Sequence, residues 1–257
     1  MSTILAAALL AQLLPGNGSG VSMGHYHLNV SDPAATRRFW VEIMGASPFQ
    51  LATIEGVKFP GAVILFKSGK PSGPTVGSVI NHIGVTVQSL KPYAGKLTAA
   101  GFVVEPGTNP KQFMVNSPDG VRVELTEDDA APVTMANHHI HWNVPSAKDA
   151  QAWYATNFGA VPGMRGKFVA ADLPGANLSF TQTDGPLLAP TKGRALDHIG
   201  FEVKNLAEFC RQLEAKGIKF DVPYRAVPQL GISIAFLTDP WGTYIELTEG
   251  LEKAAAH

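Results

Sequence analysis

Four segments of the chain open on a histidine and then alternate apolar and polar residues, and this recurrence constrains the fold more than any other feature. Each segment has a valine five residues after its histidine. The segments are His25 to Val30, His82 to Val87, His139 to Val144 and His198 to Val203. A period of two is the period of a β-strand, whose alternate side chains point to opposite faces. The recurrence therefore predicts four copies of one structural unit.

Two further alternating segments place a glutamate behind a tight turn. The turns are Ser117-Pro-Asp-Gly120 and Asp239-Pro-Trp-Gly242, and the segments are Val121 to Glu127 and Thr243 to Glu249. Within these segments Glu124 and Glu246 alternate with apolar residues, so each falls on the polar face of its strand. Two histidines and one carboxylate thus recur in the same order in each half of the chain.

The histidines and glutamates could be ordinary polar positions of half-buried antiparallel sheets, which alternate in this way without any ligand. Histidine is not favoured in strands, however, and that reading does not explain why it opens four repeats. Imidazole with carboxylate suits first-row transition metals, and we therefore predict metal binding in at least one half.

Helical segments follow the histidine strands. Asp32 and Pro33 read as an N-cap and first helical residue, and Gly45 ends that helix. Ser146 to Phe158 is its counterpart, and Asn205 is expected to cap a third helix. Each repeat then consists of a strand, a helix and a run of short strands.

The repeats resemble the vicinal oxygen chelate superfamily, which includes glyoxalase I, fosfomycin-resistance enzymes and extradiol dioxygenases. The most specific segments are Leu196 to Val203 and Phe236 to Leu247. The resemblance implies an α+β fold of four βαβββ modules, paired into two domains with curved mixed sheets around a cleft. It also implies metal ligands, namely His25, His82 and Glu124 in the first domain and His139, His198 and Glu246 in the second.

The resemblance and the composition divide the chain into five parts. Residues 1–21 form an apolar N-terminal segment with a Gly-rich linker, 22–128 the first domain, 129–135 a linker, 136–250 the second domain and 251–257 a tail. The N-terminal apolar run lacks the positive charge of a secretory signal. We expect a cytoplasmic protein, with export to the periplasm left open.

Two departures from known subgroups bear on the activity. Glyoxalase I usually takes a fourth ligand from places that hold Leu65 and Ser179 here. Extradiol enzymes usually have a tyrosine ten residues before the final glutamate, where this chain has Phe236, and a histidine upstream of it, which is missing. A site with three protein ligands leaves positions open for substrate and oxygen, as in non-haem iron(II) oxygenases. We therefore expect a dioxygenase-like enzyme, with a glyoxalase-like lyase or isomerase as the alternative.

A third reading is a protein that sequesters a small molecule without catalysis, as bleomycin-resistance members do. Under the enzyme readings, the metal is Fe(II) or Mn(II), with Zn(II) or Ni(II) as alternatives. His27 and His141 follow the ligand candidates on the same strand face and are candidate acid–base residues. Weaker substrate candidates on the polar faces are Asn29, Asn143, Arg122 and Tyr244.

The composition limits the classes of partner that the protein is expected to bind. The net charge is −1 and charged residues make up 16% of the chain, so no basic surface indicates nucleic acid. The apolar run from Ile4 to Leu14 is too short to span a bilayer. The single cysteine, Cys210, excludes a disulfide within the chain. The expected partner is a small-molecule substrate, and a homodimer stays open.

Overall fold

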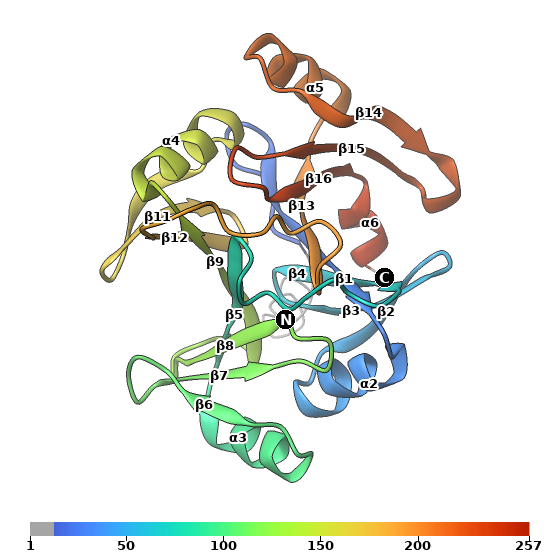
Figure 1. The fold of residues 1–257 in the computed structure, drawn as a ribbon. Coiled ribbons are helices and arrows are strands. Elements are labelled where there is room, and N and C mark those ends of the chain that lie inside the picture. The colour runs from blue at the N-terminus through green and yellow to red at the C-terminus, as the bar shows by residue number, and fades with distance from the viewer. Residues whose placement is uncertain (1–12, 257) are drawn as a thin grey trace, which may run out of the picture.

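A computed structural model describes residues 13–256, which form two eight-stranded mixed sheets. Figure 1 shows that helices α2, α3, α4 and α5 lie at the periphery of the molecule. The N-terminal segment expected over 1–21 extends into residues 1–12, which lie outside the described part. None of the described helices is long and apolar enough to cross a membrane.

The four predicted modules are present. The first comprises β1 (Val21–Val30), α2 (Pro33–Arg38), the π-helix η1 (Phe39–Ile43), β2 (Ser47–Leu51), β3 (Ile54–Phe59) and β4 (Ala62–Ser68). The second comprises β5 (Ile80–Val87), α3 (Leu90–Ala99), β6 (Val104–Pro106), β7 (Gln112–Asn116) and β8 (Arg122–Glu127). The third comprises β9 (Met135–Val144), α4 (Ala147–Phe158), β10 (Val161–Arg165), β11 (Phe168–Leu173) and β12 (Ala176–Gln182). The fourth comprises β13 (Leu196–Val203), α5 (Leu206–Ala215), β14 (Phe220–Val227), the 3-10 helix η2 (Pro228–Leu230), β15 (Ile232–Thr238) and β16 (Tyr244–Glu249), followed by α6 (Leu251–Ala255).

Each sheet combines modules from both halves of the chain. The sheet that contains β1 has the order β14-β15-β16-β13-β1-β4-β3-β2, so it joins the first module to the fourth. The sheet that contains β5 has the order β10-β11-β12-β9-β5-β8-β7-β6 and joins the second module to the third. We call them the β1 sheet and the β5 sheet. The expected pairing of the first module with the second, and of the third with the fourth, is therefore wrong.

Antiparallel pairs of histidine strands lie at the centre of both sheets. In the β1 sheet, His27 of β1 is in register with His198 of β13, and His25 with Gly200. In the β5 sheet, His82 of β5 is in register with His141 of β9. Both pairs contain register shifts, which let neighbouring segments of one strand change the face that they present.

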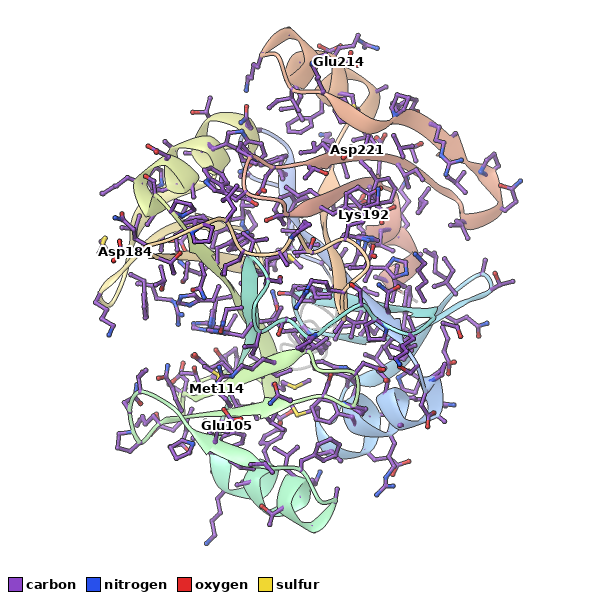
Figure 2. The ribbon with its side chains drawn as sticks, in the orientation of Figure 1. Glu105, Met114, Asp184, Lys192, Glu214 and Asp221 are labelled. Atoms are coloured by element: carbon purple, nitrogen blue, oxygen red, sulfur yellow. The ribbon has the colours of Figure 1, made fainter. Side chains whose placement is uncertain are left out.

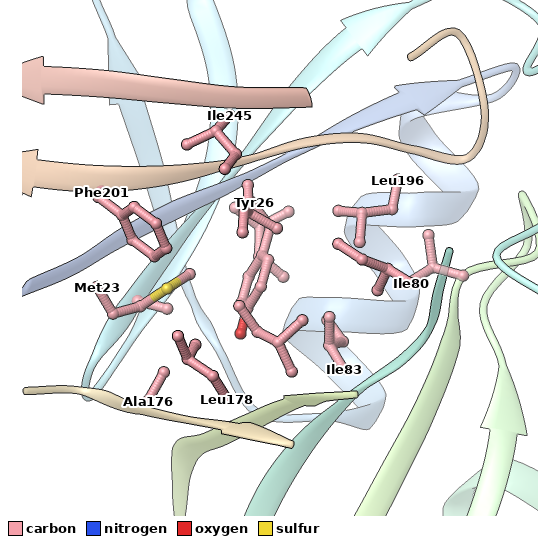
Figure 3. Close-up of a cluster of buried hydrophobic side chains, with 14 of the residues drawn as sticks. Met23, Tyr26, Ile80, Ile83, Ala176, Leu178, Leu196, Phe201 and Ile245 are labelled. Atoms are coloured by element: carbon pink, nitrogen blue, oxygen red, sulfur yellow. The ribbon is translucent and has the colours of Figure 1, made fainter. Parts of the chain in front are cut away.

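The apolar faces of the two sheets share one core. Figure 3 shows side chains of both sheets meeting there, with Tyr26 and Phe201 from the β1 sheet and Ile83 and Leu178 from the β5 sheet. The Tyr26 hydroxyl donates a hydrogen bond of 2.8 Å to Asn137 across this junction. Because the apolar faces are packed together, the polar faces with the histidines and glutamates point away from the shared core.

Capping interactions explain where the helices begin. The Asp32 side chain accepts a hydrogen bond from the Ala35 N–H at 3.0 Å, and Ser146 accepts one from the Asp149 N–H at 3.3 Å. Both predicted caps are confirmed. The cap expected from Asn205 is wrong, because its side chain makes no capping hydrogen bond. The carboxylate of Glu249 accepts from the first N–H groups of that helix instead.

The turns before the two glutamate strands are held by their own first residues. Asp239 Oδ1 accepts hydrogen bonds from the N–H groups of Trp241 and Thr243, and Gly242 has φ +99°. Ser117 Oγ accepts from the N–H of Val121 in the corresponding turn. A positive φ suits glycine, which has no Cβ to clash with the backbone. These turns set the register of β16 and β8 and hence the positions of Glu246 and Glu124.

A second apolar cluster covers the polar face of the β1 sheet. It includes Leu51, Leu65 and Ile234 from the sheet, Leu251 and Ala255 from α6, and Leu13. The residues from 251 onward, expected to be a tail, thus include a helix with two buried apolar side chains. Lys58 Nζ also donates to the carbonyl of Ala255 at 2.9 Å.

A buried carboxylate holds the start of α6. Glu202 Oε1 accepts from the N–H groups of Gly250 at 2.7 Å and Glu252 at 3.4 Å, and Oε2 accepts from Thr248 Oγ1 at 2.7 Å. Burial raises the pKa of Glu202 to about 7, although these hydrogen bonds oppose the rise. The folded protein therefore binds this proton more tightly than the unfolded chain does.

We expect Glu202→Gln to flatten the pH dependence of stability. Because the folded-state pKa is raised, stability from protonated Glu202 is present below the unfolded pKa of about 4.3 and is lost as pH rises through about 7. Up to about 3 kcal/mol of unfolding free energy is involved. In urea unfolding at pH 5 and pH 8, the unfolding free energy of the variant, relative to that of the parent, should be higher at pH 8 than at pH 5. Glu214→Gln, at an exposed position of α5 (Figure 2), is the control. Parallel pH profiles for the parent and Glu202→Gln would contradict the assignment.

Candidate metal centres

The first candidate centre lies on the β1 sheet and consists of His25, His27, His198 and Glu246. One ligand atom from each of these residues lies within 4.8 Å of all the others. His25 Nε2 and His198 Nε2 are each 2.9 Å from Glu246 Oε2. We call this group the β1 centre.

The second candidate centre lies on the β5 sheet and consists of His82, His139, His141 and Glu124. The three histidines have ligand atoms within 4.8 Å of one another. His82 Nε2 is 3.2 Å from His139 Nε2 and 3.3 Å from Glu124 Oε2, and His139 Nε2 is 3.8 Å from Glu124 Oε1. We call this group the β5 centre.

The spacing of these donor atoms fits a single transition-metal ion in each centre. Metal–nitrogen and metal–oxygen bonds of about 2.1 Å place neighbouring ligand atoms about 3 Å apart. The donor atoms of the two centres are separated by 2.9 to 3.8 Å, which is close to this spacing. The Nε2 atoms of His82 and His139 also face each other, which a shared cation accommodates directly. The residues present therefore fit a divalent metal.

The structure regroups the six ligand candidates. His25 lies with His198 and Glu246, and His139 lies with His82 and Glu124. The expected sets, His25 with His82 and Glu124, and His139 with His198 and Glu246, are therefore wrong as groupings. The reason is the module pairing, because each sheet takes one histidine strand from each half of the chain.

Asp197 orients His198 in the β1 centre, and the sequence analysis missed it. Asp197 Oδ1 is 2.7 Å from His198 Nδ1, and Oδ2 accepts from Asn29 Nδ2 and the Gly193 N–H. Burial alone would raise the pKa of Asp197, but the hydrogen bond to His198 and these donors hold it well below its usual range. A carboxylate on Nδ1 fixes the ring so that Nε2 faces Glu246, where it would be free to bind a metal. The feature of the sequence that could have indicated this role is the position of an acidic residue directly before His198.

Electrostatics favour an ionised carboxylate in the β1 centre. Burial alone would raise the pKa of Glu246, but hydrogen bonds from His198 and His25 hold it well below its usual range. Burial would lower the pKa of His198, yet hydrogen bonds to Asp197 and Glu246 raise it. The centre thus gathers negative charge around the imidazoles, which is the charge that a bound cation needs.

The β5 centre is supported differently. Asn81 Oδ1, 2.9 Å from His82 Nδ1, takes the place that Asp197 has in the β1 centre. Gln112 Nε2 and Thr126 Oγ1 each donate to Glu124 Oε1 at 3.0 Å. Burial alone would raise the pKa of Glu124, but hydrogen bonding and the charge of His82 lower it. A neutral amide beside His82 leaves this centre with less negative charge than the β1 centre.

His27 and His141, the predicted acid–base residues, lie beside the ligand candidates. The ring centroid of His27 is 4.6 Å from that of His198, and the ring centroid of His141 is 4.6 Å from that of His82. Burial, followed by the charge of a neighbouring histidine, lowers the pKa of each to about 3. Both rings are therefore neutral at physiological pH, the form that can bind a metal or accept a proton. His141 Nε2 is also 2.7 Å from Thr181 Oγ1.

In each centre a glycine makes room for one of the histidines. A Cβ at Gly200 would overlap with the imidazole of His25, and a Cβ at Gly84 would overlap with that of His139. Each glycine is the cross-strand neighbour of the histidine concerned. The His-Ile-Gly sequence of β5 and β13 therefore supplies a ligand and a space for the ligand of the neighbouring strand.

The four weaker substrate candidates have different surroundings. Asn29 Nδ2 donates hydrogen bonds to Asp197 Oδ2 and to the Arg194 carbonyl. Arg122 forms an ion pair with Glu105, with 2.7 Å between Nη2 and Oε2. Tyr244 stacks on Phe236 at 5.0 Å beside His198, and Lys192 Nζ lies 4.2 Å from the centroid of the Tyr244 ring. Asn143 is partly buried on β9. Their roles toward a substrate stay a prediction.

The two polar faces differ in what lines them. Equivalent positions of the two sheets can be found by counting strand registers outward from the histidines of each centre. By this count, the places of Leu51, Leu65 and Ile234 in the β1 sheet are taken by Arg165, Ser179 and Gln112, respectively, in the β5 sheet. The three β1-sheet residues belong to the second apolar cluster, which includes Leu13 and α6. A cavity of about 740 Å³ is lined by neighbours of the β5 centre but by none of its four residues: His138 precedes His139, Asn177 is in register with His139, and Arg165 also lines it. The sequence alone pointed to no specific role for Arg165, Gln112 or His138.

Comparisons with known proteins agree with this architecture. The family model described as Glyoxalase/Bleomycin resistance protein/Dioxygenase superfamily matches residues 22–125 and again 136–247. Glyoxalase I from Zea mays superposes with a TM-score of 0.70 at 15% identity, over 91% of this chain and 94% of that one. A candidate dioxygenase from Bacillus subtilis gives 0.68 at 14% identity, over 89% and 84% of the two chains. The cppA protein of Streptococcus pneumoniae gives 0.51 at 11% identity, over 93% and 99%.

No curated protein matches the chain. At these identities the solved structures establish the fold alone, whereas the two matches of the family model together cover most of the chain. The double match, the four modules and the two eight-stranded sheets agree on one assignment. The chain belongs to the glyoxalase/bleomycin resistance/dioxygenase superfamily.

Proposed function

We propose that the protein is a metal-dependent, dioxygenase-like enzyme that binds a small oxygen-rich molecule through two adjacent oxygens. The observation that carries the proposal is the convergence of two imidazoles and one carboxylate in each centre, with donor atoms at the spacing of metal ligands. Two histidines and one carboxylate are the ligand set of non-haem iron(II) oxygenases. Fe(II) or Mn(II) is the favoured metal, and Zn(II) or Ni(II) the alternative.

The residues of each centre have distinct proposed tasks. His25, His198 and Glu246 would hold one metal, and His82, His139 and Glu124 the other. A bound metal supplies Lewis acidity to the substrate oxygens. His27 and His141, neutral beside the ligands, would contact the substrate and accept its hydroxyl proton at a ring nitrogen. Asp197 and Asn81 would keep the ligand rings in place.

The test begins with metal analysis of protein purified anaerobically without chelator. The Fe(II)-reconstituted parent is expected to consume oxygen with catechol-type substrates, and a variant with Glu246→Ala and Glu124→Ala is expected to retain neither metal nor oxygen uptake. Circular dichroism of both proteins checks that the fold survives. A parent that binds no metal after reconstitution sinks the proposal.

A glyoxalase-like lyase or isomerase is the second candidate, favoured by one observation. His27 places a fourth donor within 4.8 Å of the other three in the β1 centre. Four protein ligands on a six-coordinate metal leave two positions, which suffice for a chelating substrate but not for oxygen as well. Isomerisation of the glutathione–methylglyoxal adduct by Zn(II)- or Ni(II)-reconstituted protein, without oxygen uptake, would favour this candidate. Tight binding of a small molecule that persists after loss of both ligand sets would instead favour sequestration.

A further inference from the structure

We propose that Arg165 is a recognition site for a carboxylate on the substrate, and that only the β5 centre therefore selects anionic ligands. The inference rests on the proposed function, because it concerns a molecule held by the metal of that centre. It assigns a substrate class, namely small chelating molecules that carry a carboxylate away from their two adjacent oxygens.

Arg165 is held close to the β5 centre by two contacts. Its Nε donates to Ser179 Oγ at 2.8 Å, and Ser179 is in register with His141 on the neighbouring strand. Its guanidinium lies 5.8 Å from the centroid of the Phe168 ring, and that ring meets the His141 ring edge-on at 4.8 Å. The guanidinium is thus fixed one side chain away from His141.

Arg165 makes no ion pair within the described part of the chain, although the charge of the nearby Glu124 carboxylate acts on its guanidinium. Among residues 13–256 no carboxylate lies within ion-pair distance of its guanidinium, although the side chain is partly buried. Partly burying a cation that has no ion-pair partner costs free energy, and an anion bound against the guanidinium would reduce that cost. A divalent metal in the centre would add further positive charge.

The cavity beside Arg165 gives an anionic ligand access. Arg165, His138 and Asn177 line it, and His138 Nδ1 is 2.9 Å from His139 Nδ1. Two carboxylates also line the cavity, but each accepts a hydrogen bond from the protein: Asp172 from Asn177 Nδ2 and Asp128 from the Ala130 N–H. Arg165 is therefore the group in this lining that an incoming carboxylate would pair with, in the bidentate geometry that guanidinium favours.

The β1 centre offers no such group at the matching place. The position in the β1 sheet that is equivalent to Arg165 is occupied by Leu51, a buried member of the apolar cluster that includes α6. A charged ligand there would lose its hydration next to leucine and isoleucine side chains without gaining an ion pair. The two centres should thus differ in the charge of the ligand that they accept.

The experiment compares two chelating probes on zinc-loaded protein, in which no turnover interferes. The probes are 3,4-dihydroxybenzoate and 4-methylcatechol, which share the adjacent hydroxyl groups but differ in charge. Glu246→Ala is included in every protein that tests Arg165 or Lys167, so that binding reports the β5 centre. Calorimetric titration should show that Arg165→Gln weakens 3,4-dihydroxybenzoate binding about 10- to 100-fold, the loss expected for a charged hydrogen-bonded pair. Binding of 4-methylcatechol should change less than about twofold.

Lys167→Gln is the matched control. Lys167 carries the same charge, lies 5.5 Å from the same Phe168 ring and is exposed, but does not line the cavity. It should leave both affinities unchanged, and Arg165→Lys should restore part of the preference. Protein with Glu124→Ala, which keeps only the β1 centre, should show no preference for the carboxylate.

The outcomes separate the two proposals. If the zinc-loaded parent binds neither probe, the proposed function fails. If it binds both probes and Arg165→Gln keeps the parent's ratio of affinities, or Lys167→Gln changes that ratio as much, the carboxylate site is overturned. Retained 4-methylcatechol binding in Arg165→Gln shows that the centre itself is intact.

Discussion

Removing His25 and Glu246 together is expected to empty one metal centre, whereas removing His25 and Glu124 together should empty both. The reason is that His25 Nε2 lies 2.9 Å from Glu246 Oε2, and Glu124 lies against His82 and His139 of the other centre. Loss of one ligand already disables a site with few protein donors, so the second substitution in the same centre adds little.

The two double variants are matched, since each exchanges one histidine and one glutamate for alanine. Equilibrium dialysis against Zn(II) followed by elemental analysis should give about half of the parent's zinc for the pair His25→Ala and Glu246→Ala. The pair His25→Ala and Glu124→Ala should retain close to none. The reverse pattern would show that each half of the chain supplies a complete ligand set, against the module pairing found here.

Gly200→Ala is expected to empty the β1 centre and to destabilise the protein. The added methyl group would overlap with the imidazole of His25, which is fully buried and cannot move aside freely. Overpacking of this kind costs roughly 1–3 kcal/mol of unfolding free energy. Urea unfolding and zinc content measure the two effects. Gly84→Ala should do the same to the β5 centre, through His139.

Gly95→Ala controls for the loss of a glycine as such. Gly95 lies within α3 and an added Cβ there would meet no atom within 4 Å. This change should leave the zinc content as in the parent and raise stability slightly, because alanine favours a helix. Gly200→Ala protein with full zinc content and the parent's stability would contradict the close packing of β1 against β13.

Local sequence signals predicted the elements of this protein well where a side chain acts on its own neighbourhood. The alternation of His25 to Val30 predicted a strand with a polar and an apolar face, and Asp32 predicted a helix start, as found. The Asp239 turn could be recognised because its side chain binds backbone groups two and four residues away. Asn205 failed as a cap because the distant Glu249 provides the acceptors.

The sequence by itself determined the four modules and the residue types of the metal sites, since strand period, turn chemistry and ligand chemistry act over a few residues. Which histidine joins which glutamate was decided by the tertiary structure alone, because sequence order does not say which strands become hydrogen-bonded neighbours. The same holds for Arg165, whose importance comes from strands that bring Ser179, Phe168 and His141 beside it. It holds also for α6 and Leu13, which cover one centre and not the other because the apolar residues they pack on lie on one sheet only.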